Sequence, residues 1–161
     1  MDDAVGARWL DAEERAAWLS LVGLLMRLSP ALDAQLRRDA GLTLFEYSVM
    51  AGLSERPGRT MRMSELAAVA EGSLSRLSQV VGRLERKGLV RRAADPTDGR
   101  STLATLTDEG WDVVVDTAPS HVAEVRRLVL DPLTRGQIRQ LAAIGRRIGR
   151  AIDPNGECPT G

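Results

Sequence analysis

The 161-residue sequence predicts a mainly α-helical fold that carries one small β-hairpin. Most of the chain shows apolar residues at three- and four-residue spacing, which is the pattern of amphipathic helices. Two short segments, 89–92 and 101–106, read as strands on either side of the turn-rich loop 95–100. Before them, a tight turn at Gly72 separates two helical segments, as in a helix-turn-helix unit.

The first predicted helix covers residues 11–39. Leucines recur along one of its faces, namely Leu21, Leu24, Leu25, Leu28 and Leu32. Pro30 lies inside this pattern, and because proline lacks a backbone N–H we expect a kink or a break near residues 28–29. Gly41 is suited to end the helix.

Capping residues predict where the next three helices begin. Thr43, with Glu46 three residues later, forms a capping-box pattern and predicts a second helix. After the basic loop from Arg59 to Arg62, whose role stays open, Ser64 is expected to cap a short third helix. Ser73 is expected to cap a fourth helix that runs to about residue 87.

The hairpin that follows the fourth helix completes a winged helix-turn-helix, and two further helices come after it. Thr107 predicts the start of a fifth helix that runs to about Leu130, and Pro119 is expected to interrupt it. The sixth helix covers residues 135–152. Its apolar face holds Ile138, Leu141, Ile144, Ile148 and Ile152.

Charge is distributed unevenly although the net charge of the chain is zero. Residues 1–55 carry a net charge of −4, residues 56–100 carry +5, and residues 101–161 carry −1. A basic middle segment between acidic flanks is typical of a protein that binds phosphates. Local fluctuation in composition is the alternative explanation.

The fourth helix carries two distinct faces. A buried face is predicted from four apolar residues at helical steps: Leu74, Leu77, Val81 and Leu84. The polar face combines small hydroxyls with side chains that can form paired hydrogen bonds: Ser73, Ser75, Arg76, Ser78, Gln79, Arg83 and Arg86. Such a face can enter the major groove of duplex DNA, where the residues expected to read base edges are Ser73, Ser75, Arg76 and Gln79. Arg83 and Arg86 are expected to hold phosphates; an ordinary solvated face is the alternative.

The hairpin loop carries a second candidate contact with DNA. Asp98 is expected to orient an arginine, and Arg100 can enter a narrow minor groove, whose negative potential attracts it. A turn that merely contains charged residues is the alternative, because aspartate and glycine are common in turns.

Several spaced motifs together resemble the MarR (multiple antibiotic resistance regulator) family. They are Leu84-Glu85-Arg86-Lys87-Gly88-Leu89-Val90-Arg91-Arg92, Asp98-Gly99-Arg100 and Leu106-Thr107-Asp108-Glu109-Gly110, with Leu42-Thr43 and Ser64-Glu65-Leu66-Ala67 upstream. The resemblance covers roughly residues 10–152. It implies a homodimer with intertwined first, fifth and sixth helices that binds a pseudo-palindrome in double-stranded DNA. It further implies a repressor that a small phenolic or lipophilic ligand releases.

We therefore expect a winged helix-turn-helix DNA-binding domain at residues 41–107. Residues 8–40 and 108–152 are expected to form a helical dimerisation region, because a winged unit of about 70 residues could not cover their apolar stripes alone. Residues 153–161 are rich in turn-forming residues and are expected to be disordered.

The resemblance also suggests where an effector would bind. Trp18, Tyr47, Met50 and Trp111 fall on the helices that surround the effector cavity in the resembled family. Plain core packing of these side chains is the alternative. Changes in tryptophan fluorescence on adding phenolic compounds would separate the two.

Other functional classes find little support in the sequence. His121 and Cys158 occur once each, which leaves no metal site, no catalytic set and no disulfide within the chain, and we expect no cofactor and no enzyme activity. Peroxide-sensing members of the resembled family use a reactive cysteine near the first helix. No cysteine lies there in this sequence, so peroxide sensing is not expected; the role of Cys158 stays open. No signal-peptide pattern and no uncharged membrane-length apolar run is found, so we expect a cytoplasmic protein without a membrane partner. The rival function is a winged-helix protein-interaction module that does not bind DNA.

Overall fold

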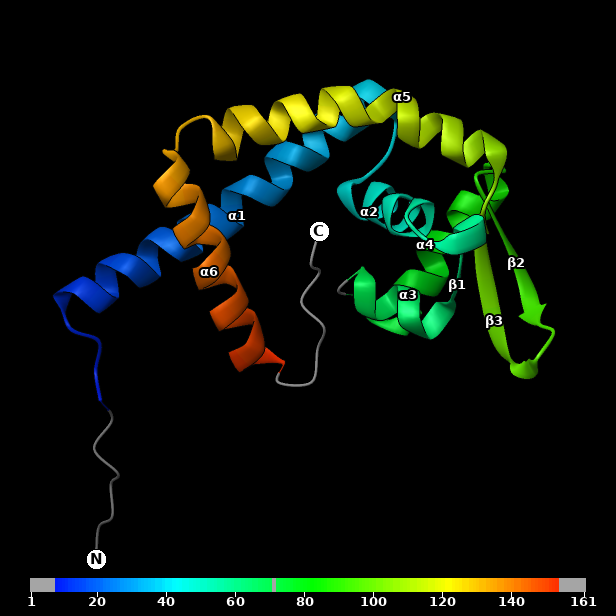
Figure 1. The fold of residues 1–161 in the computed structure, drawn as a ribbon, viewed down its shortest axis with the longest axis horizontal. Coiled ribbons are helices and arrows are strands. Elements are labelled where there is room, and N and C mark those ends of the chain that lie inside the picture. Colours follow the sequence, from blue (N-terminus) through cyan, green and yellow to red (C-terminus); the bar gives the residue numbers. More distant parts are fainter. Residues whose placement is uncertain (1–7, 71, 154–161) are drawn as a thin grey trace, which may run out of the picture.

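A computed structural model describes residues 8–70 and 72–153, which form a compact lobe joined to a long helical arm (Figure 1). The elements in chain order are α1 (Ala12–Ala40), α2 (Leu44–Ser54), η1 (Pro57–Arg59), β1 (Thr60–Arg62), α3 (Met63–Val69), α4 (Leu74–Arg86), β2 (Val90–Asp95), β3 (Asp98–Leu106), α5 (Asp108–Val125), η2 (Arg126–Leu130) and α6 (Arg135–Ile152). The predicted fold class is confirmed: a mainly helical chain with a winged helix-turn-helix. The predicted disordered tail, with Cys158, lies outside the described residues apart from Asp153.

Helix starts follow the capping residues where the side chain accepts a backbone hydrogen bond. Thr43 accepts from the backbone N–H of Glu46 at 3.0 Å, Ser73 from that of Arg76 at 3.2 Å, and Thr107 from that of Gly110 at 3.0 Å. The prediction for Ser64 is wrong, because α3 already begins at Met63 and no side chain caps it. Strand β1 continues directly into α3, so an extended Arg62 takes the cap position.

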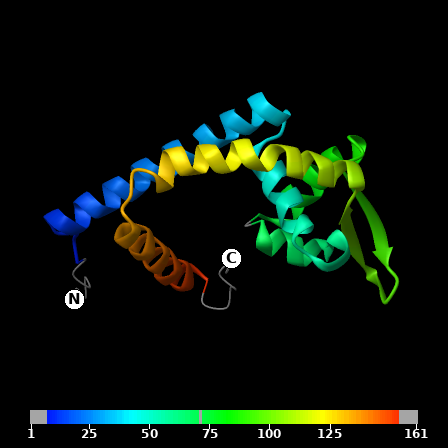
Figure 2. The same cartoon turned by 45° about the horizontal axis from the view of Figure 1, so that its top comes forward.

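The two prolines do not break their helices. Helix α1 runs unbroken through Pro30 and α5 runs unbroken through Pro119, so the predicted break and interruption are wrong. Both prolines are exposed, which lets water solvate the carbonyl groups that proline leaves without a donor. The two helices lie side by side along the arm (Figures 1 and 2), and α5 ends in the wider turn η2.

The sheet has three antiparallel strands in the order β1-β3-β2. Strand β1 was not predicted: the basic loop contains it, and Thr60 pairs with Thr105. The wing strands are longer than predicted, so the turn consists of Pro96 and Thr97 alone. Residues 98–100 therefore start β3 instead of forming the tip of a loop.

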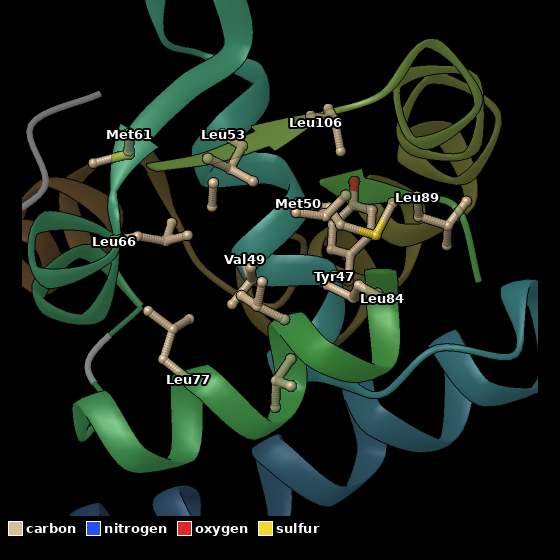
Figure 3. Packing of buried hydrophobic residues seen from close by; sticks show 14 of the residues in the cluster. Tyr47, Val49, Met50, Leu53, Met61, Leu66, Leu77, Leu84, Leu89 and Leu106 are labelled. Atoms are coloured by element: carbon tan, nitrogen blue, oxygen red, sulfur yellow. The ribbon is translucent and has the colours of Figure 1, made fainter. Parts of the chain in front are cut away.

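The lobe encloses one apolar core around α2 (Figure 3). Val49, Met50 and Leu53 of α2 are fully buried, and Leu77 and Leu84 of α4 pack against them. Leu74 was predicted to join this face, but its side chain is 55% exposed. As the first residue of α4, it lies beyond the end of the core, and Val80 completes the buried face instead.

The arm leaves large apolar side chains uncovered in the single chain. The most exposed are Trp9, Leu10, Trp18, Leu19, Leu24, Leu25, Met26, Val115, Val122, Leu141, Ile144, Ile148 and Ile152. Helix α6 has no buried residue at all. Among the described residues, only α1 is long and apolar enough, by length and composition, to cross a membrane. A helix that packs against a second copy of the chain has the same composition, and Arg27 interrupts the apolar stretch of α1.

Candidate nucleic-acid interface

The predicted contact residues lie on two neighbouring elements, helix α4 and the wing. All seven predicted side chains of α4 and its cap are exposed, as is Arg100, whereas Asp98 is partly buried. A hollow of about 320 Å³ separates the N-terminal half of α4 from the wing. The residues that line it are Arg62, Met63, Ser64, Leu74, Ser78, Arg92, Arg100, Ser101 and Thr102. The structure thus brings Ser78 and Arg100 to one site.

The three arginines of this hollow differ in their partners. Arg62 donates to the Asp95 carboxylate at 2.9–3.0 Å, and Arg92 pairs with Glu85 at 2.7 Å. Within the described part of the chain, the Arg100 guanidinium has neither a hydrogen bond nor an ion pair. Arg100 is therefore the arginine of the hollow that is free to bind a phosphate or a base edge.

Asp98 shapes the wing backbone rather than orienting an arginine side chain. Its carboxylate accepts from the backbone N–H of Arg100 at 3.2 Å and from the hydroxyl of Ser101 at 2.8 Å. Such bonds fix the first residues of β3 and thereby the direction in which Arg100 leaves the strand.

Arg76 is held against helix α2. Its guanidinium lies 4.2 Å from the ring centroid of Phe45, a cation–π contact that restrains the arginine while leaving it exposed. The same ring explains Gly72, because a Cβ atom there would lie 2.7 Å from the Cζ atom of Phe45. The turn before α4 therefore needs glycine for room.

Arg83, which is expected to hold a phosphate, is 45% exposed and also pairs with Glu46 of α2. Its Nε atom lies 3.2 Å from the Glu46 carboxylate, whose side chain is 6% exposed. Burial alone raises the pKa of Glu46, but the Thr43 backbone N–H and the Arg83 guanidinium outweigh it, and the pKa lies below its ordinary value of 4.5. Arg86 stays exposed, with its Nε atom donating to the carbonyl of Gly82.

Glu46→Gln is expected to reduce the free energy of unfolding by about 1–2 kcal/mol at neutral pH, because Arg83 loses its charged partner. A carboxyl with a lowered folded-state pKa stabilises above the unfolded value of 4.5, and this stabilisation disappears as the pH falls through the folded value. Urea unfolding of both proteins from pH 7 to pH 3 should therefore show a shrinking difference. Glu55→Gln, at an exposed carboxylate of the same lobe, is the control; a gap for Glu46→Gln that does not change with pH would contradict the pairing.

The proposed effector residues occupy different environments. Tyr47 and Met50 are buried in the core, and Trp111 packs at its edge beneath Arg59, whose guanidinium lies 4.2 Å from the ring. Trp18 is 54% exposed on α1 and does not belong to this cluster. The structure thus gathers three of the four residues around the core.

Sequence reasoning missed Arg62 and Arg92, although both lie in the basic middle segment. Their partners, Asp95 and Glu85, are also in that segment, but pairs across elements leave no periodic signal in a sequence. In the described residues, no group of three or more His, Cys, Asp or Glu side chains is placed to hold a metal ion.

Comparison with known proteins identifies the family. A family model described as MarR family matches residues 40–101. The crystal structure of Sco3205, a MarR family transcriptional regulator from Streptomyces coelicolor solved in complex with DNA, is similar with a TM-score of 0.90 and 44% identity, over 96% of this chain and 95% of that chain. AbsC, a MarR family transcriptional regulator from the same organism, gives a TM-score of 0.88 and 35% identity over 92% of this chain and 100% of that chain.

A sequence relative agrees with these structures. The HTH-type transcriptional repressor Rv2887 of Mycobacterium tuberculosis is 34% identical over 128 residues, which is 80% of this chain and 88% of the relative. The similarity extends over both the winged lobe and the helical arm. This chain belongs to the MarR family of transcriptional regulators.

Proposed function

We propose that this chain regulates transcription by binding duplex DNA sequence-specifically, as a homodimer on a pseudo-palindromic operator. The observation that carries this proposal is the unpaired Arg100 of the wing beside the exposed polar face of α4. The DNA complex of Sco3205 supports it, since that protein is 44% identical to this chain.

In this proposal α4 enters the major groove. The residues proposed to contact base edges are Ser73, Ser75, Arg76 and Gln79, because the first turns of a recognition helix lie deepest in the groove. Arg86 binds the DNA backbone, while Arg100 reaches into the neighbouring minor groove. A protein-interaction module is the rival, but it would need no free arginine beside a polar recognition helix.

Homodimerisation follows from the uncovered apolar side chains of α1, α5 and α6. A two-fold interface would bury them and would place the two α4 helices about 34–36 Å apart, which is one turn of DNA. We infer a cytoplasmic repressor that is not an enzyme, and a small phenolic or lipophilic ligand that releases it by binding near Tyr47, Met50, Trp18 and Trp111. If no such compound changes the tryptophan fluorescence or the DNA affinity of the protein, the proposal of an effector site is refuted.

The decisive experiment is selection of bound duplexes from a random DNA pool by the purified protein. The proposal predicts an enriched sequence with two inverted half-sites. A pool that stays random, or a protein that ignores duplexes at low salt, would favour the protein-interaction module.

Arg100→Ala is expected to weaken binding to the selected duplex by about 1–3 kcal/mol, roughly 5- to 150-fold, because a groove contact is lost. Arg91→Ala is the matched control. Arg91 alternates with Arg92 along β2 and so lies on the wing face turned away from the hollow. Fluorescence anisotropy should show less than about a threefold loss for the control, which removes charge only. If Arg100→Ala and Arg91→Ala lose the same affinity, Arg100 contributes only its charge and makes no specific contact in a groove.

A further inference from the structure

Glu85 is an acidic residue in the last turn of the candidate recognition helix. It is the only acidic residue within α4, whose sequence is LSRLSQVVGRLER. A carboxylate near the DNA backbone repels phosphates, so electrostatics alone disfavours it on this helix. Its contacts within the protein give a reason for its presence.

Glu85 binds the wing through both carboxylate oxygens. One oxygen accepts from the backbone N–H of Arg92 at 3.0 Å, and the other accepts from the Arg92 side chain, at 3.0 Å from Nε and 2.7 Å from Nη2. Arg92 belongs to β2, an edge strand, whose outer backbone donors need partners from outside the sheet. Three bonds to two oxygens fix direction as well as distance.

We propose that Glu85 is a positioning residue for DNA binding: with Arg92 it locks the wing against α4 and so fixes the hollow beside which Arg100 stands. This inference rests on the proposed function. The ion pair has no net charge, so the Glu85 carboxylate repels DNA less than a free carboxylate would.

The connection between α4 and the wing explains why such a lock is needed. Only residues 87–89 separate the helix from β2, and Gly88 turns the chain there with a φ of 74°. At the far end of β2, Arg62 holds Asp95 and ties the wing to the start of α3. Besides the pairing of β3 with β1, two ion pairs thus hold the wing, and of the three arginines in the hollow only Arg100 is left for DNA.

The pair itself is half-exposed, at 35% for Arg92 and 36% for Glu85, so it adds little to global stability. The Arg92 guanidinium, and after it the Arg92 backbone N–H, holds the pKa of Glu85 below its usual value. The effect of losing the pair should therefore be seen in DNA binding and wing dynamics more than in melting temperature.

Glu85→Ala separates positioning from electrostatics because the two predict opposite signs. Removing an acid from the DNA-facing lobe should raise affinity if charge alone matters. If Glu85 positions the wing, affinity for the selected duplex should fall by about three- to tenfold, which is the usual contribution of one hydrogen-bonded pair that is partly exposed to solvent. Glu65→Ala, at an exposed acid of α3, is the matched control and should leave affinity unchanged or raise it by up to about twofold.

Arg92→Ala completes a double-mutant cycle. The double variant should bind no worse than Arg92→Ala alone, because either substitution already breaks the pair. Strictly additive losses, or a Glu85→Ala protein that binds DNA as well as or better than the wild type, would overturn the proposal.

Hydrogen exchange of the Arg92 amide in the free protein provides a readout without DNA. Exchange should accelerate in Glu85→Ala and stay unchanged in Glu65→Ala, with circular dichroism verifying that both variants are folded. If exchange accelerates in Glu85→Ala but the wild type does not bind DNA, the proposed function is refuted and the contact between Glu85 and the wing is supported. An amide that stays protected in Glu85→Ala would refute the lock whatever happens to DNA binding.

Discussion

Replacing Ile144 with aspartate is expected to turn the protein into a monomer and to weaken binding to a full operator duplex by at least about 100-fold. The Ile144 side chain is 55% exposed in the single chain, so the substitution costs the isolated fold little. In a dimer, the new carboxylate would be buried against apolar side chains without a partner, which costs several kcal/mol. A monomer reaches one half-site only and loses the gain from simultaneous binding of two.

Light scattering after size-exclusion chromatography measures the oligomeric state, and anisotropy with full-site and half-site duplexes measures affinity. Arg146→Gln is the matched control, because it changes the net charge by the same amount on the polar side of α6. The variant Ile144→Asp should bind a half-site about as well as the wild type binds it. A variant that stays dimeric would exclude the α6 face from the interface, and Trp18 or Leu25 of α1 would be the next positions to substitute.

Helices were predictable from sequence where their signals are local. Thr43, Ser73 and Thr107 each lie within three residues of the N–H group they accept from, so the cap is visible in the sequence itself. The same local reasoning overstated the effect of proline. Pro30 and Pro119 each remove one hydrogen bond from a long helix, and the neighbouring bonds and the packing of α1 on α5 hold the rest.

Features that depend on distant partners could not be predicted. Strand β1 has three residues, too few for an alternation, and exists because β3 pairs with it across about 40 residues of chain. Its formation also moved the start of α3 away from Ser64.

The candidate site shows the same division. The exposed polar face of α4 follows from its helical period, whereas the role of each arginine depends on whether a carboxylate lies within reach. Arg83 has Glu46 and Arg92 has Glu85, while Arg100 has none among the residues described. The sequence marked Arg83 and Arg100 alike as candidate DNA contacts and did not mark Arg92, and only the fold shows which of the three has a carboxylate partner.

Gly110→Ala is expected to destabilise the protein by about 3 kcal/mol, at the upper end for an overpacked site. A Cβ atom at this position would overlap the carbonyl oxygen of Leu89 and would lie 2.7 Å from the Cδ1 atom of Leu106. Two hydrogen bonds prevent the Leu89 backbone from moving away from the added Cβ atom. Its N–H donates to the Leu84 carbonyl at 3.0 Å and its carbonyl accepts from the Thr107 N–H at 3.1 Å.

Thermal unfolding should show a melting temperature lower by about 10 °C, since 1 kcal/mol corresponds to roughly 2–4 °C in a chain of this size. Gly82→Ala is the same substitution inside α4, where the added Cβ would meet only the Arg92 Nη2 atom, at 3.8 Å. That control should gain about 0.5–1 kcal/mol from better helix propensity, so the two variants move in opposite directions. If Gly110→Ala has the same melting temperature as the wild type, α5 can shift away from Leu89 without a loss of stability. The junction between the arm and the recognition helix would then be too loose for dimer geometry to set the spacing of the two DNA-binding lobes.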